Sequence, residues 1–348
     1  MTKSIYILLL FTIISLSAFS QAGSGVYQFL DLPVSSRQAA LGGSNISLRD
    51  NDINFSFINP ALLTSETNQS IGLNMASYLA DVKFGSAVYG KTFDSKNYFA
   101  VGIQYVDYGK FLQTTELNEI IGQFTAKDMA LNIMYARPLN KFFTVGATFK
   151  PIFSAYEMYT SYGLAFDAGV SFNDSLHNFS AGLVLRNMGT QLKGYYSDES
   201  GQHIEPLPFN IQLGLSKRFA HAPLRISLTL HHLQQFKLNY QSTNQPVQTD
   251  GSAISNKAGN ISFVDMAFRH AIFALEFIPS KNFYLSAAYN HQLHQELSMN
   301  GFKSMAGFSF GGGIKLYKFQ VGFGTTTYQV GNSSYQFSIS TSLNQFKL

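Results

Sequence analysis

Alternation of apolar and polar side chains dominates the chain from about residue 70 onward. It is clearest in residues 208–233, where every second residue is apolar on both sides of one tight turn. Successive side chains of a strand point to opposite faces, so this pattern predicts two antiparallel strands, each with one apolar and one polar face. Residues 142–152 and 335–343 repeat the pattern. The sequence therefore predicts an all-β fold whose strands meet an apolar environment on one side.

About fourteen such segments follow one another, each close to the 9–11 residues with which a tilted strand crosses a bilayer. The predicted strands cover residues 70–78, 82–92, 98–108, 128–137, 142–152, 162–172, 177–186, 209–219, 224–233, 268–278, 282–291, 305–315, 318–327 and 335–343. No convincing helical period interrupts them. After the first residues, no segment contains the roughly 18 continuous apolar residues of a membrane helix.

The connections between the predicted strands alternate in length. Every second connection is short, at residues 93–96, 138–141, 173–175, 220–223, 279–281 and 317. The intervening connections are mostly longer, and the longest are 109–127, 187–208 and 234–267. Outer-membrane barrels have short periplasmic turns and long extracellular loops, whereas a soluble sandwich has no reason to sort its loops in this way. A sheet in lipid must also close on itself. We therefore predict a transmembrane antiparallel β-barrel of about 14 strands.

Residues 21–69 differ from the rest of the chain. They read as a short helix over 35–43 that ends at a Gly-Gly pair, a polar turn, and a loop closed by Asn-Pro. A barrel of this size encloses a lumen that its own side chains do not fill. The sequence therefore predicts that residues 21–69 plug the barrel formed by residues 70–348.

The first residues indicate export. Lys3 precedes an apolar run over residues 5–14, and the small residues Ala18 and Ser20 suit cleavage before Gln21. This order of basic, apolar and small regions is typical of a secretory signal peptide, here residues 1–20, and less so of a buried N-terminal helix.

Composition fits a membrane barrel. Only 13% of the residues are charged, whereas about a quarter is usual in soluble domains. The chain has no Cys, which excludes a disulfide framework and a thiolate site, and its 19 Tyr and 32 Phe can supply interfacial aromatic girdles. The basic residues are scattered, so the net charge of +4 does not indicate nucleic-acid binding.

Catalytic and metal-binding patterns are weak. Residues 307–311 match G-x-S-x-G, but Ser309 lies inside an alternating strand and not at the strand-to-helix turn that this motif requires. Two groups could bind a metal: His291 and His294 with Glu296, and His231 with His232. Neither has a third-ligand pattern, and such loop histidines are more often solvated. We predict no enzymatic activity, no cofactor and no metal.

Four charged residues fall on the polar faces of predicted strands: Lys150, Arg225, Glu276 and Lys315. We interpret them as lumen-lining groups that pair with the plug or with each other. Selectivity for a solute is the alternative interpretation.

Several strings resemble known outer-membrane proteins. Residues 35–43, the acidic turn and residues 59–62 are similar to the N-terminal hatch of FadL-like barrels. Residues 25–35, 78–81, 187–193, 206–209, 220–223 and 231–234 more closely resemble the PorQ-like family of the type IX secretion system of Bacteroidetes. The resemblance runs from about residue 23 to the end of the chain. It implies a hatch containing Arg37, Gly42, Gly43, Asp50, Asn59 and Pro60.

This resemblance implies a non-enzymatic anchor in the outer membrane of a Gram-negative bacterium. PorQ-like proteins belong with PorU, PorV and PorZ to a complex that removes the C-terminal signal of secreted cargo and joins the cargo to lipopolysaccharide. The PorQ-like member would hold a PorZ-like protein at the surface through its long loops. Candidate contacts are Phe111, Leu112, Ile120, Ile121, Tyr195 and Tyr196. The alternative is a FadL-type transporter that moves an apolar ligand past the hatch.

Overall fold

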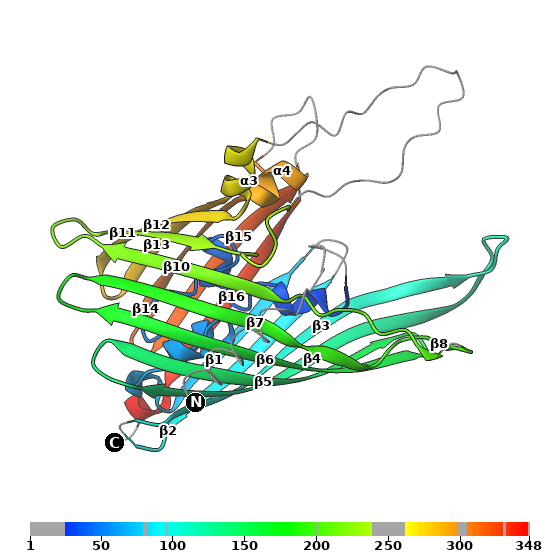
Figure 1. Cartoon of the computed structure of the whole chain (residues 1–348), viewed down its shortest axis with the longest axis horizontal. Coiled ribbons are helices and arrows are strands. Elements are labelled where there is room, and N and C mark those ends of the chain that lie inside the picture. The colour runs from blue at the N-terminus through cyan, green and yellow to red at the C-terminus, as the bar shows by residue number, and fades with distance from the viewer. Residues whose placement is uncertain are drawn as a thin grey trace, which may run out of the picture.

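The computed structural model describes residues 25–78, 82–94, 96–199, 201–238, 262–297, 305–329 and 332–346. Within these ranges, fourteen strands form one closed antiparallel barrel (Figure 1). Strands that follow one another along the chain are neighbours in the wall, and the barrel closes where β1 (Ser70–Ser77) pairs with β16 (Asn332–Ser342). The predicted signal peptide, with Ala18, Ser20 and Gln21, lies outside the described residues.

The remaining barrel strands are β2 (Lys83–Thr92), β3 (Tyr98–Thr114), β4 (Ile120–Pro138), β5 (Phe143–Tyr156), β6 (Tyr159–Asp174), β7 (Phe179–Lys193), β10 (Asn210–Arg218), β11 (Leu224–Leu230), β12 (Ala271–Ser280), β13 (Phe283–Asn290), β14 (Phe308–Leu316) and β15 (Phe319–Gln329). A separate small hairpin consists of β8 (Ser197–Asp198) and β9 (Gly201–Gln202). The α-helices are α2 (Ser36–Ala40), α3 (Phe263–Arg269) and α4 (His291–Leu297). The 3-10 helices are η1 (Gln28–Asp31), η2 (Ile53–Phe57), η3 (Pro60–Leu62), η4 (Ser65–Thr67) and η6 (Leu343–Phe346).

The prediction of fourteen barrel strands is confirmed, but two of the predicted connections and the start of one predicted strand are wrong. Residues 109–127 are mostly strand, because β3 and β4 continue as a paired hairpin. Residues 187–208 begin with the end of β7 and contain the small hairpin. Phe268, the predicted start of a strand, belongs to α3. Of the predicted loop 234–267, residues 239–261 lie outside the described part.

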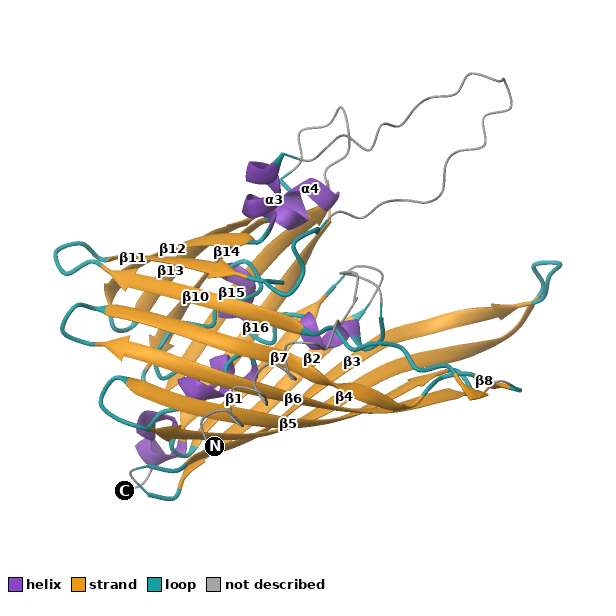
Figure 2. Ribbon diagram, in the orientation of Figure 1, coloured by secondary structure: helices purple, strands orange, loops and turns teal. Residues whose placement is uncertain are grey.

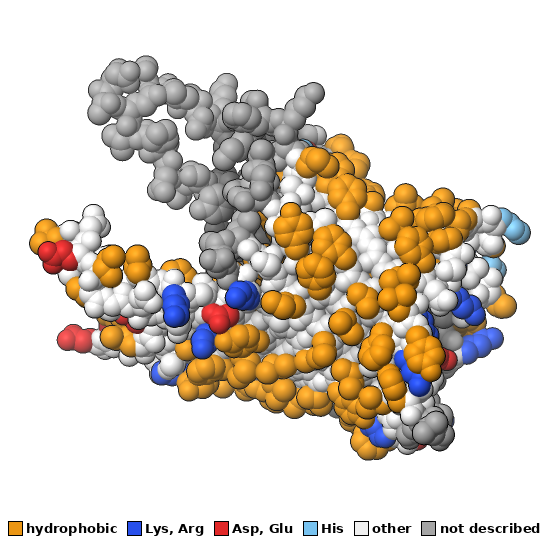
Figure 3. Space-filling model, turned by 180° about the vertical axis from the view of Figure 1, so that it is seen from behind, with side chains coloured by type: hydrophobic (Ala, Val, Ile, Leu, Met, Phe, Trp, Pro, Cys, Tyr) orange, Lys and Arg blue, Asp and Glu red, His pale blue; other side chains and the backbone are white. Residues whose placement is uncertain are grey.

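The two faces of the wall differ as the alternation predicted. Outward side chains such as Leu73 and Val101 are apolar and about half exposed, whereas inward ones such as Asn132, Thr148 and Ser171 are polar and buried. Figure 3 shows apolar side chains over the wall, with charged side chains gathered toward its two ends. An apolar belt around a closed sheet is the surface that lipid hydrocarbon requires, because the ladder leaves no strand edge unpaired.

The first barrel strand, β1, begins on the same rim where the last strand, β16, ends. The Leu343 N–H donates to the Gln69 carbonyl oxygen at 2.8 Å, so η6 lies beside the start of β1. The short connections lie on this same rim (Figure 2). In outer-membrane barrels this rim faces the periplasm.

The strands are unequal in length. β3 to β7 contain 14–19 residues each, whereas β10 to β14 contain 7–10. The longer strands project beyond the rest of the barrel on the side away from the short turns (Figures 1 and 2). We call this projecting part, residues 107–127, 153–162, 187–199 and 201–207, the extracellular flare.

Short helices stand at the extracellular ends of the shorter strands. α3 and α4 lie there together, joined by Asp265 Oδ1 and His291 Nε2 at 2.8 Å. The expectation of no helix after residue 70 was wrong because seven residues are too few to display a helical period. None of the helices in the described ranges is long and apolar enough to cross a membrane.

Candidate functional site

Residues 25–69, which we call the hatch, lie inside the barrel and contact opposite parts of its wall. α2 contacts β13 to β16, whereas η3 contacts β4, β5 and β6. Figure 2 shows these helices within the ring of strands. The hatch contributes buried apolar side chains that pack on the wall, among them Leu41, Ile46, Phe55 and Ile58 against Val184 and Ala274. The described part of the predicted plug, residues 25–69, therefore packs against the inner side of the wall.

Four charged side chains fasten the hatch to the wall. Arg37 Nη2 lies 2.5 Å from Asp50 Oδ2 and 3.0 Å from Glu276 Oε1. Arg225 Nη1 lies 2.6 Å from Asp50 Oδ1, and its Nη2 lies 2.6 Å from Glu276 Oε2. Two residues come from the hatch and two from neighbouring wall strands. The quartet contains equal numbers of positive and negative charges, so each buried charge has partners of opposite sign.

Local structure around Arg37 fixes its position in this quartet. The Ser35 side chain accepts from the Gln38 N–H at the start of α2, and Gly42 and Gly43 follow the end of the helix with φ of 84° and 95°. A side chain at Gly42 would also collide with the wall, since a Cβ there would lie 2.5 Å from Ile272 Cγ2. The Gly-Gly pair therefore turns the chain after α2, where Gly42 lies beside Ile272 of β12.

Asn59 and Pro60 organise the second part of the hatch. Asn59 Oδ1 accepts from the Ala61 N–H at 3.0 Å, which caps η3, and Asn59 Nδ2 donates to the Ile46 carbonyl oxygen at 2.9 Å. Pro60 occupies the first position of η3, where a missing N–H costs nothing. Asn59 thus joins two turns of the hatch.

Wall glycines make room for the hatch. At each, a Cβ would lie less than 3.0 Å from a hatch atom. They are Gly72, Gly90, Gly102, Gly146, Gly163, Gly169, Gly182, Gly214, Gly311, Gly322 and Gly324. A glycine inside a strand often marks close approach of another backbone. We call this set the glycine belt. Sequence reasoning missed it, although glycines at inward positions of alternating strands were visible.

A second group of buried charges lies elsewhere on the wall. Lys150 Nζ is 2.5 Å from Asp167 Oδ2, and both side chains are almost fully buried. Arg186 Nη2 donates to the carbonyl oxygen of Leu30 in the hatch at 2.9 Å. The interpretation of Lys150, Arg225 and Glu276 as paired lumen residues is confirmed. Lys315 is instead exposed near the short-turn rim.

The space left between hatch and wall is small where the quartet lies. A cavity beside Arg37, lined also by Ser36, Tyr284 and Ser338, has a volume of about 10 Å³. That is close to the volume one water molecule needs. Arg37 closes it further by lying over the Tyr284 ring, with 4.4 Å between the guanidinium carbon and the ring centroid.

The extracellular flare exposes the apolar residues that the sequence nominated for a partner. The Phe111 ring stacks on Phe124 with centroids 5.3 Å apart. Leu112, Ile120 and Ile121 are 56%, 65% and 62% exposed. Phe111 and Leu112 are adjacent in β3, so they lie on opposite faces of the flare.

The two tyrosines nominated with them differ in role. Tyr196 is 57% exposed and stacks on His203. Tyr195 is partly buried and donates to Ser154 Oγ at 2.5 Å, and Ser154 in turn donates to the buried Asp128. Burial raises the pKa of the Tyr195 hydroxyl, which keeps its proton available for that bond. Tyr195 therefore braces the base of the flare.

Asp128 has further tyrosine partners. Tyr108 and Tyr156 both donate to its Oδ2 atom, at 2.7 and 2.8 Å. Three strands, β3, β4 and β5, thus converge on one carboxylate where the flare leaves the barrel. Sequence reasoning did not identify Asp128, because its partners lie on other strands.

Residues that suggested metal or catalytic chemistry have structural partners. Ser309 Oγ donates to Thr326 Oγ1 inside the wall. Four other potential ligands form hydrogen bonds: His294 with the Ala306 carbonyl oxygen, Glu296 with Gln292, and His231 and His232 with each other. Across the described ranges, no three His, Cys, Asp or Glu side chains are grouped so that they could hold a metal ion.

His291 links the two extracellular helices. It pairs with Asp265, which also forms an ion pair with Arg269 at 3.0 Å. Burial acts to raise the pKa of Asp265, but its hydrogen bonds with His291 and Arg269 hold that pKa below its usual range. The group therefore fastens α4 to α3.

Comparison with known proteins supports the fold. The sequence matches no family model and no curated protein. The TodX monoaromatic hydrocarbon channel deltaS2 mutant is similar in structure, with 13% identity, 90% of this chain and 98% of that chain covered, and a TM-score of 0.52. The Pseudomonas putida toluene transporter TodX aligns with 11% identity, the same coverage and a TM-score of 0.51. A Pseudomonas aeruginosa FadL homologue gives 11% identity, coverage of 89% and 98%, and a TM-score of 0.49. With the geometry above, the TodX likeness shows that this chain is a closed 14-stranded antiparallel barrel with the fold of FadL-like outer-membrane proteins.

Proposed function

We propose that this protein is an outer-membrane barrel that holds a protein partner at the cell surface. The observation that carries the proposal is the extracellular flare, which displays apolar side chains on paired strands beyond the rest of the wall. On one face of these strands Phe111 stacks on Phe124, and an exposed apolar patch in water marks an interaction site.

The flare is built to keep its contact residues in place. The β3–β4 hairpin of the flare stays paired as far as Thr114 in β3 and Ile120 in β4. The tyrosines that bind Asp128 hold the base of the flare together. A partner that binds a preformed surface loses little additional conformational entropy. Aromatic residues such as Phe111 are enriched among the side chains that dominate binding energy.

The partner we propose is a PorZ-like surface protein, acting with PorU-like and PorV-like components of a type IX secretion system. Support for this identity comes from the sequence strings that resemble PorQ-like proteins, including residues 25–35 and 187–193. On this proposal the protein belongs to the outer membrane of a member of the Bacteroidetes, where lipopolysaccharide would surround it. The role is non-enzymatic.

Charged substitutions on the flare test the proposal. Phe111→Asp combined with Ile121→Asp should weaken partner binding at least tenfold, because each introduces a carboxylate into an apolar contact. The measurement is recovery of surface proteins with the tagged barrel from detergent-solubilised outer membranes. Recovery of a PorZ-like protein and a sortase with the unaltered barrel is expected.

Leu176→Asp is the matched control, because Leu176 is 87% exposed at a short turn on the opposite rim. It should leave recovery unchanged. Full recovery of the surface partner with the flare variant would contradict the proposed anchoring role. Failure to recover any surface protein with any form of the barrel would contradict it as well.

Transport of an apolar ligand is the second candidate. Two TodX structures with the same fold carry the descriptions monoaromatic hydrocarbon channel and toluene transporter. For this chain, transport past Arg37 would require the hatch to move, since the hatch packs on the wall there and leaves a cavity of about 10 Å³. Uptake of toluene by cells that express the barrel, with a co-purifying apolar ligand and no surface partner, would favour transport over anchoring.

A further inference from the structure

The first turn of the hatch, residues 25–31, lies at the extracellular opening of the barrel, and we call it the mouth turn. The Val26 N–H donates to the Pro206 carbonyl oxygen at 3.0 Å, and the Tyr27 hydroxyl lies 2.5 Å from Ser161 Oγ. Pro206 follows the small hairpin, and Ser161 lies near the start of β6, after the β5–β6 turn. Both belong to the extracellular flare, so the described hatch begins at the base of the flare.

The hatch extends from this opening to the opposite rim. Asp31 Oδ1 accepts from Asn187 Nδ2 at 3.2 Å, on the part of β7 that rises beyond the first residue of β10. The last hatch residue, Gln69, accepts from the Leu343 N–H on the rim of the short turns. One end of the hatch is therefore at each rim. Gln28 is an exposed side chain of the extracellular end.

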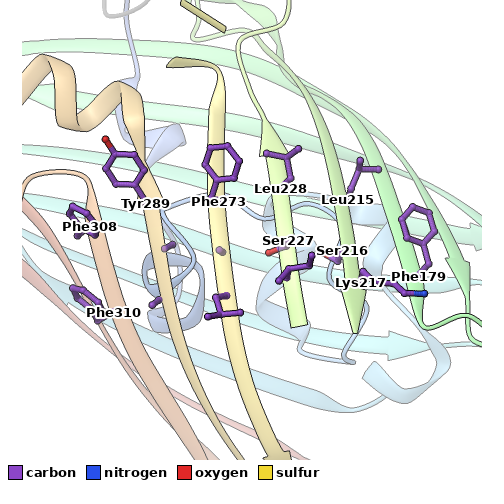
Figure 4. Close-up of a pocket in the computed structure, with 15 residues that line it drawn as sticks. Phe179, Leu215, Ser216, Lys217, Ser227, Leu228, Phe273, Tyr289, Phe308 and Phe310 are labelled. Atoms are coloured by element: carbon purple, nitrogen blue, oxygen red, sulfur yellow. The ribbon is translucent and has the colours of Figure 1, made fainter. Parts of the chain in front are cut away.

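The shorter wall, β10 to β14, shows how high the mouth turn lies. In Figure 4, Leu215, Leu228 and Phe273 stand on the membrane side of this wall, with the hatch behind the strands. β10 begins opposite Arg186 of β7, and Arg186 Nη2 donates to the Leu30 carbonyl oxygen at 2.9 Å. The mouth turn thus lies beside the extracellular end of β10, and the flare strands continue past it.

The stacked aromatic rings of the flare lie on the same side of the sheet as the mouth turn. Phe124, Asp128 and Asn132 are separated by even numbers of residues in β4, so they share one face. That face is the inner one, because Asn132 is an inward side chain of the barrel. Phe111 pairs with Phe124 and stacks on it. Both rings therefore lie on the inner face of the flare, above the opening.

Half-buried tyrosines connect these rings with the mouth turn. Tyr108 and Tyr195 pack against the apolar cluster that contains Val26 and Tyr27. Phe111 is three residues beyond Tyr108, about 10 Å along β3. A standard protein interface buries about 800 Å² on each partner, which is a patch roughly 30 Å across. A protein that covers Phe111 from the inner side therefore also reaches the mouth turn.

We propose that the protein partner held by the flare also contacts the mouth turn of the hatch. The inference rests on the proposed anchoring function and adds the plug to the contact surface. The partner then recognises the barrel with its hatch in place, because Gln28 and the flare form one surface only while the hatch keeps its contacts with Ser161 and Pro206. Partner binding and displacement of the hatch oppose each other.

Cysteine labelling on intact cells tests this contact, because the chain contains no Cys. Gln28→Cys is treated with a membrane-impermeant maleimide in the cells used for partner recovery. Labelling should be about tenfold slower with the unaltered flare than in combination with Phe111→Asp and Ile121→Asp, because a bound partner excludes solvent from the surface it covers. Leu176→Asp is the control on the opposite rim and should leave the labelling slow.

Two further positions calibrate the reagent. Glu116→Cys, at the exposed tip of the flare, should be labelled on intact cells, whereas Glu66→Cys, at the exposed periplasmic end of the hatch, should be labelled only after the outer membrane is permeabilised. If Gln28→Cys with the altered flare behaved like Glu66→Cys, the mouth turn would not face the exterior and the proposal would be overturned. Equal labelling of Gln28→Cys with and without the bound partner would also overturn it. Failure to recover any surface partner contradicts the anchoring role itself, so the two failures are distinguishable.

Discussion

Replacement of Glu276 by alanine should loosen the hatch and lower the free energy of unfolding by about 3–5 kcal/mol, the usual cost of removing one partner from a buried ion pair. Glu276 is 1% exposed and accepts hydrogen bonds from Arg37 and Arg225, at 3.0 and 2.7 Å. Without it, two buried guanidinium groups share the single carboxylate of Asp50. Their repulsion acts on the contact between hatch and wall.

Two measurements distinguish loosening of the hatch from a general folding defect of the barrel. The thermal unfolding midpoint in detergent should fall, and proteases should gain access to residues 25–69 at temperatures where the barrel itself remains folded. Glu119→Ala, an exposed carboxylate on the flare, is the control and should change neither. A Glu276→Ala protein whose hatch stays as resistant as that of the control would show that the quartet does not hold the hatch.

Substitution of Gly182 by valine should displace the hatch by steric force. A Cβ at this position would lie 2.3 Å from the Ile46 carbonyl oxygen, which is backbone and cannot rotate away. Overpacking of this kind costs about 1–3 kcal/mol, and the same movement would strain the Asn59 bond to Ile46. Single-channel recording in planar bilayers should therefore detect ion conductance above that of the unaltered barrel.

Gly85→Val provides the comparison for this experiment. Gly85 also lies within a wall strand, but the nearest atom to its Cβ would be the Asn74 carbonyl oxygen at 3.7 Å. Valine there should be tolerated, because β-branched residues favour strands. Equal conductance in the two variants would mean that the close approach at Gly182 does not position the hatch.

Alternation predicted the barrel strands because lipid on one side and a polar lumen on the other impose a period of two residues. The paired strands of the flare were not predicted, because the contrast between lipid on one face and a polar lumen on the other ends there. Beyond the membrane both faces of β3 and β4 meet water, and the register shifts between Asp107 and Lys110, so the apolar residues change face. A segment with mixed polarity on both faces reads as a loop even when it is fully paired.

The lumen was partly predictable for a similar reason. The alternation of side chains along the strands placed Arg225 and Glu276 on the inner face. Their partners could not be deduced, because Arg37 and Glu276 are 239 residues apart in the chain. The glycine belt is the feature that connects hatch and wall most directly. Its signal is the recurrence of glycine at inward positions, where packing between strands alone would favour larger side chains.

Because the strands are unequal in length, one side of the barrel extends farther from the membrane than the other. The flare rises over β3 to β7, while the wall from β10 to β14 ends lower, beneath α3 and α4. A partner resting on the flare would sit to one side of the barrel axis and leave the lower wall accessible from the side. Two neighbours could then bind one barrel at once without competing, so the order of assembly around it need not be fixed.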